Sequence, residues 1–177
     1  SGIISGAGSL VKIGSGTLTL SGTNTYTGST TINVGAIRIS ADSGLGAAPG
    51  SITADHLTIN GGTLTSTADF TLSSNRGVAL GSSHGTFRVN GSTTLTVAGI
   101  VSGSNNLIKS ASGTLILSGV NTYSGTTTIN GGTLNISGQL GSGSYSNTIS
   151  NSGTFEVNFG NPVSALDNTA ITDDNGC

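Results

Sequence analysis

The chain has 177 residues, more than half of which are Gly, Ser, Thr or Asn, and only 7% of which are charged. Its formal net charge is -2, and its five Lys and Arg residues are spread singly, so it lacks the clustered positive charge on which nucleic-acid binding depends. No apolar run approaches the roughly 20 residues of a transmembrane helix, and Ser1 does not open a signal peptide, so we expect any export signal or anchor outside this sequence.

A short motif, Gly-[Thr/Ala]-[Leu/Phe/Ile]-x-[Leu/Ile/Val/Ser], recurs along the whole chain. Its seven copies begin at Gly16, Gly35, Gly62, Gly85, Gly113, Gly132 and Gly153. Because side chains alternate between the two faces of a strand, the residues two and four places after each Gly should share one face. These inward residues are Leu18 and Leu20, Ile37 and Ile39, Leu64 and Ser66, Phe87 and Val89, Leu115 and Leu117, Leu134 and Ile136, and Phe155 and Val157. The motif therefore predicts stacked strands with one continuous inward column, which only Ser66 interrupts with a polar side chain.

A longer repeat lies above the short one. Residues 2–40 align without a gap to residues 99–137, with 24 of 39 positions identical. Corner sequences such as Asn60-Gly61-Gly62 and Asn130-Gly131-Gly132 follow the short apolar stretches, and no window has a convincing helical period. The sequence thus predicts an all-β protein, a right-handed parallel β-helix of about seven to nine rungs. We expect the β-helix to cover 1–160, with 161–177 as a non-repeat polar tail or the start of a following segment.

Carboxylates suited to acid-base catalysis are few and scattered. Asp42 and Asp55 flank a loop from Leu45 to Pro49, and Asp69 precedes a strand. A glycosidase or polysaccharide lyase needs such groups to converge in one groove. The remaining carboxylates are Glu156, Asp167, Asp173 and Asp174. The sequence therefore predicts no catalytic residues, and a polysaccharide-acting enzyme stays a minor alternative.

Metal ligation has equally weak support. His56 and His84 lack a third ligand nearby and are expected at the surface. The run Asp173-Asp174-Asn175-Gly176 offers oxygen ligands but lacks the spacing of a calcium loop, so a solvated tail is expected. The sequence predicts no obligatory metal and no cofactor.

Two aromatic residues occupy matching places in the long repeat. Asn24 and Asn121 each begin an Asn-Thr-Tyr segment that contains Tyr26 or Tyr123. A pair of rings on one edge would suit sugar binding, but we favour tyrosines that pack over turns and asparagines that bond the local backbone.

Threonines on the outward face raise the possibility of ice binding. Thr17 and Thr19, with Thr63 and Thr65, would suit a flat threonine face. The equivalent outward positions of other rungs hold Arg38, Arg88, Asn135 and Glu156, which would break it.

Two segments, Gly16-Thr-Leu-Thr-Leu-Ser-Gly-Thr-Asn-Thr-Tyr-Thr-Gly28 and Gly113-Thr-Leu-Ile-Leu-Ser-Gly-Val-Asn-Thr-Tyr-Ser-Gly125, closely resemble the passenger-associated β-strand repeat of bacterial autotransporters. The resemblance covers most of residues 2–137. After about Gly160 the sequence departs from the family pattern, because the short motif disappears. It implies a right-handed parallel β-helix displayed at the cell surface or secreted, with an adhesive, autoaggregative or spacer role. The family pattern carries no catalytic residues to transfer to this chain.

We therefore expect a structural or adhesive passenger segment that meets other cells, extracellular matrix or its own copies, with no nucleic-acid partner and no membrane insertion. End-to-end stacking into an extracellular filament is the alternative. Cys177, the only cysteine, is either an incidental terminus or a thiol that pairs two chains through an intermolecular disulfide.

Overall fold

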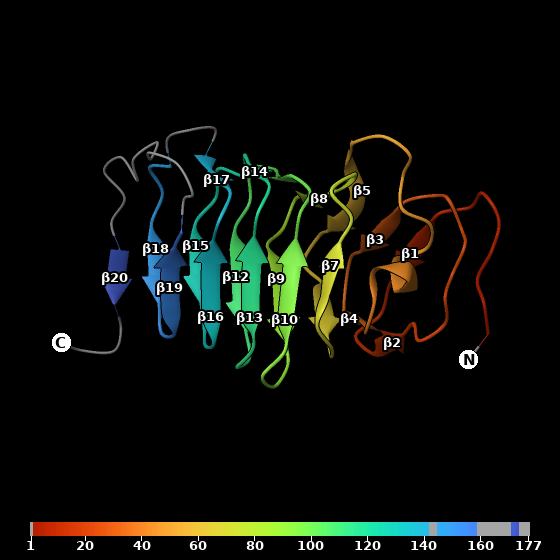
Figure 1. Ribbon diagram of the computed structural model, residues 1–177, viewed down its shortest axis with the longest axis horizontal. Coiled ribbons are helices and arrows are strands. Elements are labelled where there is room, and N and C mark those ends of the chain that lie inside the picture. Colours follow the sequence, from red (N-terminus) through yellow and green to blue (C-terminus); the bar gives the residue numbers. More distant parts are fainter. Residues whose placement is uncertain (1, 142–144, 159–170, 174–177) are drawn as a thin grey trace.

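The chain forms a parallel β-solenoid in a computed structural model that describes residues 2–141, 145–158 and 171–173. The strands stack side by side along the long axis, from the amino-terminal end to the carboxy-terminal end (Figure 1). The paired strands all run parallel to their neighbours, and the described residues contain one short 3-10 helix, η1 (Asp42–Leu45), and no α-helix. In this part of the chain no helix is long and apolar enough to cross a membrane.

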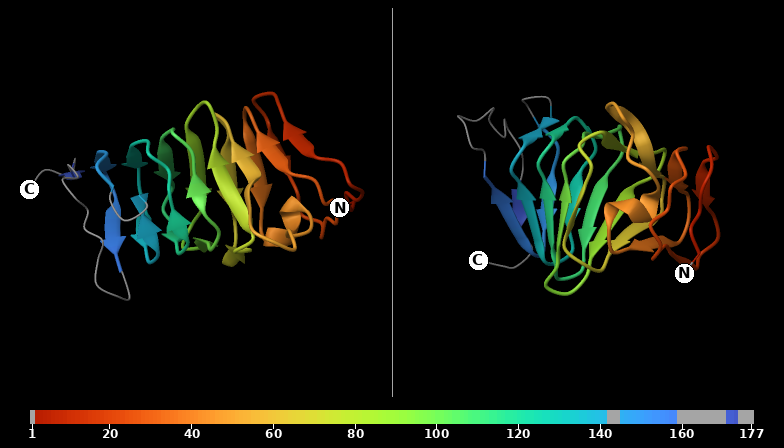
Figure 2. Two further views of the ribbon diagram at one scale, coloured as in Figure 1. Left: turned by 90° about the horizontal axis from the view of Figure 1, so that it is seen from above. Right: turned by 45° about the vertical axis from the view of Figure 1, so that its right-hand side comes forward.

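The strands form three long sheets and one short sheet that wrap around a common core (Figure 2). Sheet A contains β1 (Leu10–Lys12), β3 (Thr30–Ile32), β5 (Thr53–Ile59), β8 (Arg76–Leu80) and β11 (Val101–Ser102). Sheet B contains β2 (Thr17–Thr19), β4 (Ala36–Ile39), β6 (Thr63–Ser66), β9 (Gly85–Val89), β12 (Leu107–Ser110), β15 (Thr127–Ile129), β18 (Ile149–Asn151) and β20 (Ile171–Asp173). Sheet C contains β7 (Phe70–Leu72), β10 (Thr94–Val97), β13 (Thr114–Leu117), β16 (Thr133–Ile136) and β19 (Thr154–Val157). Sheet D contains β14 (Val120–Asn121) and β17 (Gln139–Leu140), and it continues the side of sheet A because β14 contacts β11.

From β5 to β13 the chain passes through sheets A, B and C in turn, whereas the strands before β5 lie on sheets A and B only. Neighbouring strands of sheet B pair Leu18 with Ile37 and Ile37 with Leu64, so a circuit varies in length. The longer second circuit accommodates η1 and the loop that follows it. Sheet B contains eight strands among the described residues, so seven steps from strand to neighbouring strand separate its two ends. The prediction of an all-β parallel β-helix with about seven to nine rungs is confirmed.

The core consists of the inward side chains that the motif predicts. Ile37, Leu64, Phe87 and Leu115 are fully buried, as are most of their partners two residues later. Ser66 is also fully buried, and its hydroxyl donates to the backbone oxygen of Ala68 over 2.9 Å, so the polar interruption is satisfied.

The inward positions are less covered in the first and last copies of the motif. Leu18 and Phe155 are half-buried, and Val157 is 39% exposed. Their strands, β2 and β19, are the end strands of sheets B and C among the described residues, so each packs against one neighbouring strand instead of two.

The motif copies do not form one column, contrary to the sequence prediction. The first four copies lie on sheet B, whereas the last three lie on sheet C, so Leu18 belongs to a different column from Leu115 and Leu134. The two long repeats are therefore rotated by one face: β1 and β2 lie on sheets A and B, and their equivalents β12 and β13 lie on sheets B and C. The reason is that 97 positions are not a whole number of circuits, and an alternating strand fits any face of the coil.

The carboxy-terminal stretch includes one more strand. β20 pairs in parallel with β18, which extends sheet B into the range 161–177 that the sequence assigns to a polar tail or a following segment.

Candidate binding surface

The carboxylates do not converge. Asp42 forms an ion pair with Arg76, with 2.9 Å between Oδ1 and Nε, whereas Asp55 is exposed and does not join it. Asp69 accepts a hydrogen bond from the Thr94 backbone nitrogen over 2.6 Å. Farther along the same side of the coil, on β19 of sheet C, the Glu156 carboxylate accepts a hydrogen bond from the Asn135 amide over 2.8 Å. Among the residues that the structure describes, no three His, Cys, Asp or Glu side chains are grouped as a metal site would require.

The remaining acidic residues and the cysteine lie near the carboxy-terminal end of the chain. Asp173 lies in β20, and Asp167, Asp174, Asn175, Gly176 and Cys177 lie outside the described residues.

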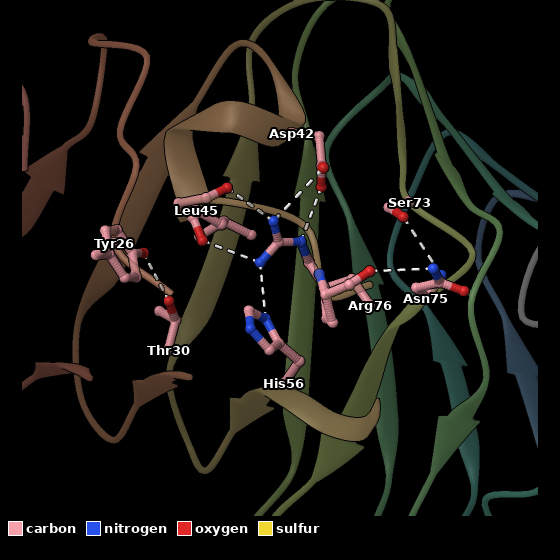
Figure 3. A network of polar contacts seen from close by, with 10 residues as sticks. Tyr26, Thr30, Asp42, Leu45, His56, Ser73, Asn75 and Arg76 are labelled. Atoms are coloured by element: carbon pink, nitrogen blue, oxygen red, sulfur yellow. Dashed lines mark hydrogen bonds and ion pairs between the residues drawn. The ribbon is translucent and has the colours of Figure 1, made fainter. Parts of the chain in front are cut away.

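Arg76 is the centre of a buried polar network where η1 meets sheet A (Figure 3). Its guanidinium donates to the backbone oxygens of Leu45 and Gly46, each over 2.9 Å, and to the Asp42 carboxylate. It also lies 2.8 Å from Nδ1 of His56. The network holds the η1 loop against the coil. The role of Asp42 is therefore structural: its carboxylate pairs with Arg76.

His56 is not a surface residue, contrary to the sequence prediction. It is 5% exposed because β5 turns its ring into the coil beneath the η1 loop. Since the Arg76 guanidinium only donates hydrogen bonds, Nδ1 of His56 must accept, which fixes a neutral ring. Burial and then the neighbouring Arg76 charge lower the pKa of His56. His84 lies in an exposed loop, as expected, and the two histidines do not form a pair.

The tyrosines lie inside the coil and do not present their rings to a sugar. Tyr26 and Tyr123 are 2% and 0% exposed, and each hydroxyl lies 2.7 Å from the hydroxyl of a buried threonine four residues later. A third ring, Tyr145, packs edge-on against Tyr123 with centroids 5.6 Å apart. Burial raises the pKa of all three phenols. The preferred interpretation of these tyrosines as packed residues agrees with the structure.

The repeated asparagines tie successive rungs together. Asn24 donates to the backbone oxygen of Gly44 over 2.8 Å and accepts from the Ile4 nitrogen. Asn121 donates to the backbone oxygens of Gly119 and Gln139. Both side chains are buried, so each satisfies backbone groups that would otherwise lack partners in the interior.

Two lysines perform a structural task that the sequence reasoning missed. The Lys109 ammonium is fully buried and donates to the backbone oxygens of Ser110, Ala111 and Gly131 over 2.8 to 3.0 Å. Lys12 makes the equivalent contacts in the first long repeat. Each lysine thereby joins its own corner to the corner of the next rung. The alternation of inward and outward positions could have predicted their burial, because each lysine occupies an inward position at the end of an apolar stretch.

The outer face of sheet B carries a shallow groove beside two arginines. One outward row runs across the strands in register through Thr19, Arg38, Thr65, Arg88 and Ser110. The groove has a volume of about 460 Å³. Besides four members of this row, its lining consists of Ser15, Thr17, Gly35, Ala36, Gly61, Thr63 and Thr86.

The outer face of sheet C is different. Thr94, Thr114, Thr133 and Thr154 are aligned in register across β10, β13, β16 and β19. Beside this row, Ile116, Asn135 and Glu156 follow one another across the last three of these strands. Arg38 and Arg88 therefore interrupt the threonines of sheet B, as predicted, while Asn135 and Glu156 belong to another face.

Comparison with known proteins places these features in a family. The family described as Passenger-associated-transport-repeat matches residues 10–39 and 107–136, the parts of the two long repeats that contain the lysine, asparagine and tyrosine positions. The chain is also similar to the adhesin BmaC autotransporter of Brucella suis biovar 1 (strain 1330), with 42% identity over 139 residues. That match covers 78% of this chain and 4% of the relative. No solved structure gives a significant match. The chain is thus an autotransporter passenger repeat protein, of a class found outside the cell or at its surface.

Proposed function

We propose that this chain acts as an adhesive segment of an autotransporter passenger, which meets other cells or extracellular matrix through the long outer faces of its β-solenoid. The observation that supports this most directly is the pair of continuous outward faces on sheets B and C, which carry hydroxyl, amide and a few charged side chains. Such faces offer many shallow hydrogen bonds and no deep cavity.

The similarity to an autotransporter adhesin supports the same proposal. A non-enzymatic role fits the scattered carboxylates, because acid-base chemistry needs groups that converge on a substrate. Weak contacts along a rod gain strength when many copies act together, so avidity should outweigh any one outward residue.

The test is to display the full passenger on cells with and without this chain, and to compare it with a deletion of equal length elsewhere in the passenger. We expect only the deletion of this chain to reduce cell aggregation or attachment to immobilised matrix. Surface staining controls for export. Unchanged aggregation and attachment with intact export would reduce the chain to a passive spacer.

Contact between copies of this chain is one form of the same adhesion. Light scattering and negative-stain microscopy of the purified chain separate it from binding to a foreign surface. Growth of regular filaments would favour the end-to-end assembly that the sequence analysis left open.

A further inference from the structure

The distribution of positive charge on this molecule is more selective than its composition suggests. The sequence contains five Lys and Arg residues. Three of them, Lys12, Arg76 and Lys109, are buried at 8%, 0% and 0% exposure, and their cationic groups bind backbone oxygens or Asp42. The other two, Arg38 and Arg88, are exposed and line the same groove on sheet B. Every exposed lysine or arginine of the chain therefore lies in that groove.

The register holds the two arginines at a fixed separation. Arg38 pairs with Thr65, which pairs with Arg88, so the two residues lie two strands apart on one outward row. Adjacent strands are about 4.8 Å apart, which separates the two backbone positions by roughly 10 Å. Thr65 between them is 4% exposed. The sheet thus presents two guanidinium groups on a rigid base.

The arginines have no anionic partner within the groove. Its lining contains hydroxyl side chains, glycines and Ala36, and no carboxylate. Arg88 donates from Nε to the amide oxygen of Asn90 over 3.0 Å, which orients its side chain without neutralising it. In the described residues the one ion pair between side chains belongs to Arg76 and Asp42. Both guanidinium groups are therefore available for a bidentate contact with an external carboxylate or sulfate.

We propose that the groove formed by Arg38 and Arg88 binds a linear acidic polysaccharide that carries sulfate or uronate groups. The arginines recognise acidic groups along the chain, while the hydroxyls of Ser15, Thr17 and Thr63 hydrogen-bond to sugar hydroxyls. This proposal deepens the proposed adhesive role, and its biological meaning rests on that role. The binding itself is a property of the purified chain and can be measured without cells.

The lining favours sugar over other anionic partners. It contains no aromatic side chain on which a nucleotide base would stack, and two cations are too few for the clustered charge of a nucleic-acid interface. Its one apolar side chain is the Ala36 methyl, which is too small to hold a lipid chain or the anchors of a peptide.

The experiment measures binding of the purified chain to three immobilised probes: dextran sulfate, oligogalacturonate and uncharged dextran. We expect one or both acidic probes to bind and uncharged dextran not to bind. The two acidic probes distinguish sulfate recognition from carboxylate recognition. Because the arginines are exposed, we expect binding to weaken as the salt concentration rises.

The variants separate the groove from general charge. Arg38→Gln and Arg88→Gln should each weaken binding by about tenfold, and the double variant should lose it. The double variant Arg38→Lys/Arg88→Lys keeps the charge but loses the planar fork, so it should bind with intermediate strength. The matched control is Thr71→Glu/Thr154→Glu on the exposed face of sheet C, which changes the net charge by the same amount and should leave binding close to the original.

Three results would overturn the proposal. They are equal binding of charged and uncharged dextran, unchanged binding by the Arg38→Gln/Arg88→Gln variant, and tighter binding of a single-stranded oligonucleotide or a poly-glutamate peptide by the same groove. Failure here leaves adhesion on cells untouched, and loss of adhesion on cells leaves this binding untouched, so the two proposals are tested separately.

Discussion

At the scale of single residues, the buried lysines stabilise the coil by hydrogen-bonding the backbone of two successive corners. Burial lowers the pKa of Lys109 to about 8, so its ammonium is still largely charged at neutral pH and can donate three hydrogen bonds. Lys109→Met keeps the length of the side chain but leaves three corner carbonyls without this donor. We expect it to lower the free energy of unfolding by about 2 to 4 kcal/mol, measured by urea denaturation.

Lys12→Met provides the matched control at the equivalent place in the first repeat. Lys12 lies in a strand at the edge of sheet A and is 8% exposed, so water can replace more of its contacts. We expect a smaller loss of about 1 kcal/mol. A Lys109→Met protein as stable as the original would show that the ammonium does not hold the two corners together.

His56 gives the coil a predictable response to acid. Its folded-state pKa lies below the ordinary value of 6.5, first because of burial and then because of the Arg76 charge. As pH falls below 6.5, the unfolded chain binds a proton at His56 that the folded chain does not bind. Stability should therefore decrease between pH 7 and pH 5, with a slope of at most about 1.4 kcal/mol per pH unit from this residue. Above pH 7 the residue should contribute no pH dependence.

Urea denaturation at several pH values checks this prediction, with one variant for each histidine. His56→Gln should flatten the slope between pH 7 and pH 5, because glutamine does not titrate and its amide oxygen can accept from Arg76. His84→Gln is the matched control, because it makes the same substitution at the other histidine, which lies in an exposed loop. The reverse pattern would contradict the role given to the buried ring.

At the scale of elements, the corners limit which sequences the coil accepts. Gly132 has a φ of 66°, and a Cβ there would contact the backbone oxygens of Gly113 and Ala111 in the previous rung. Gly132→Ala would add both the cost of a left-handed conformation and a clash with backbone atoms. We expect it to destabilise the protein by about 3 to 4 kcal/mol in thermal or urea unfolding.

Gly91 separates these two costs. Its φ is 59°, but a Cβ at this position would have nothing within 4 Å. Gly91→Ala should therefore show the conformational cost alone, about 1 to 2 kcal/mol. Equal losses for the two variants would mean that close contact between rungs contributes little to the corner at Gly132.

At the scale of the whole molecule, a solenoid should tolerate the loss of a whole circuit better than the loss of part of one. Residues 110–129 form one circuit, because Lys109 pairs with Ile129 in the neighbouring strand. Deleting them should preserve the β-sheet signal in circular dichroism and reduce the denaturant m-value by roughly a tenth, since less surface is buried.

Deletion of residues 110–119 is the control, because it removes only half of the circuit and shifts the following strands out of register. We expect this shorter deletion to be the more damaging of the two, with a lower unfolding midpoint. If the longer deletion caused the greater loss, contacts between neighbouring rungs would not be the main source of stability.

The sequence by itself determined the strands, the inward pairs and the parallel stacking. Apolar and polar residues alternate around positions such as Leu64 and Leu115, and this pattern favours a strand that buries its apolar face. The pattern involves only neighbouring positions in the sequence, so it can be read without the fold. The family also followed from the sequence, because Asn121 and Tyr123 recur with their neighbours in an ordered pattern.

The tertiary structure alone decided which face each strand occupies. The spacing from Gly35 to Gly62 is one circuit with an enlarged loop, while the nearly equal spacing from Gly85 to Gly113 is one circuit plus the step to the next face. A local apolar pattern fits every face equally well, so it does not distinguish these two cases. Only the folded coil shows that His56 is buried. It also places Arg38 and Arg88 in one groove, because the strand register that aligns them depends on the lengths of all the loops between them. Those lengths act together only in the folded coil, which is why the candidate site emerged from the structure and the strands emerged from the sequence.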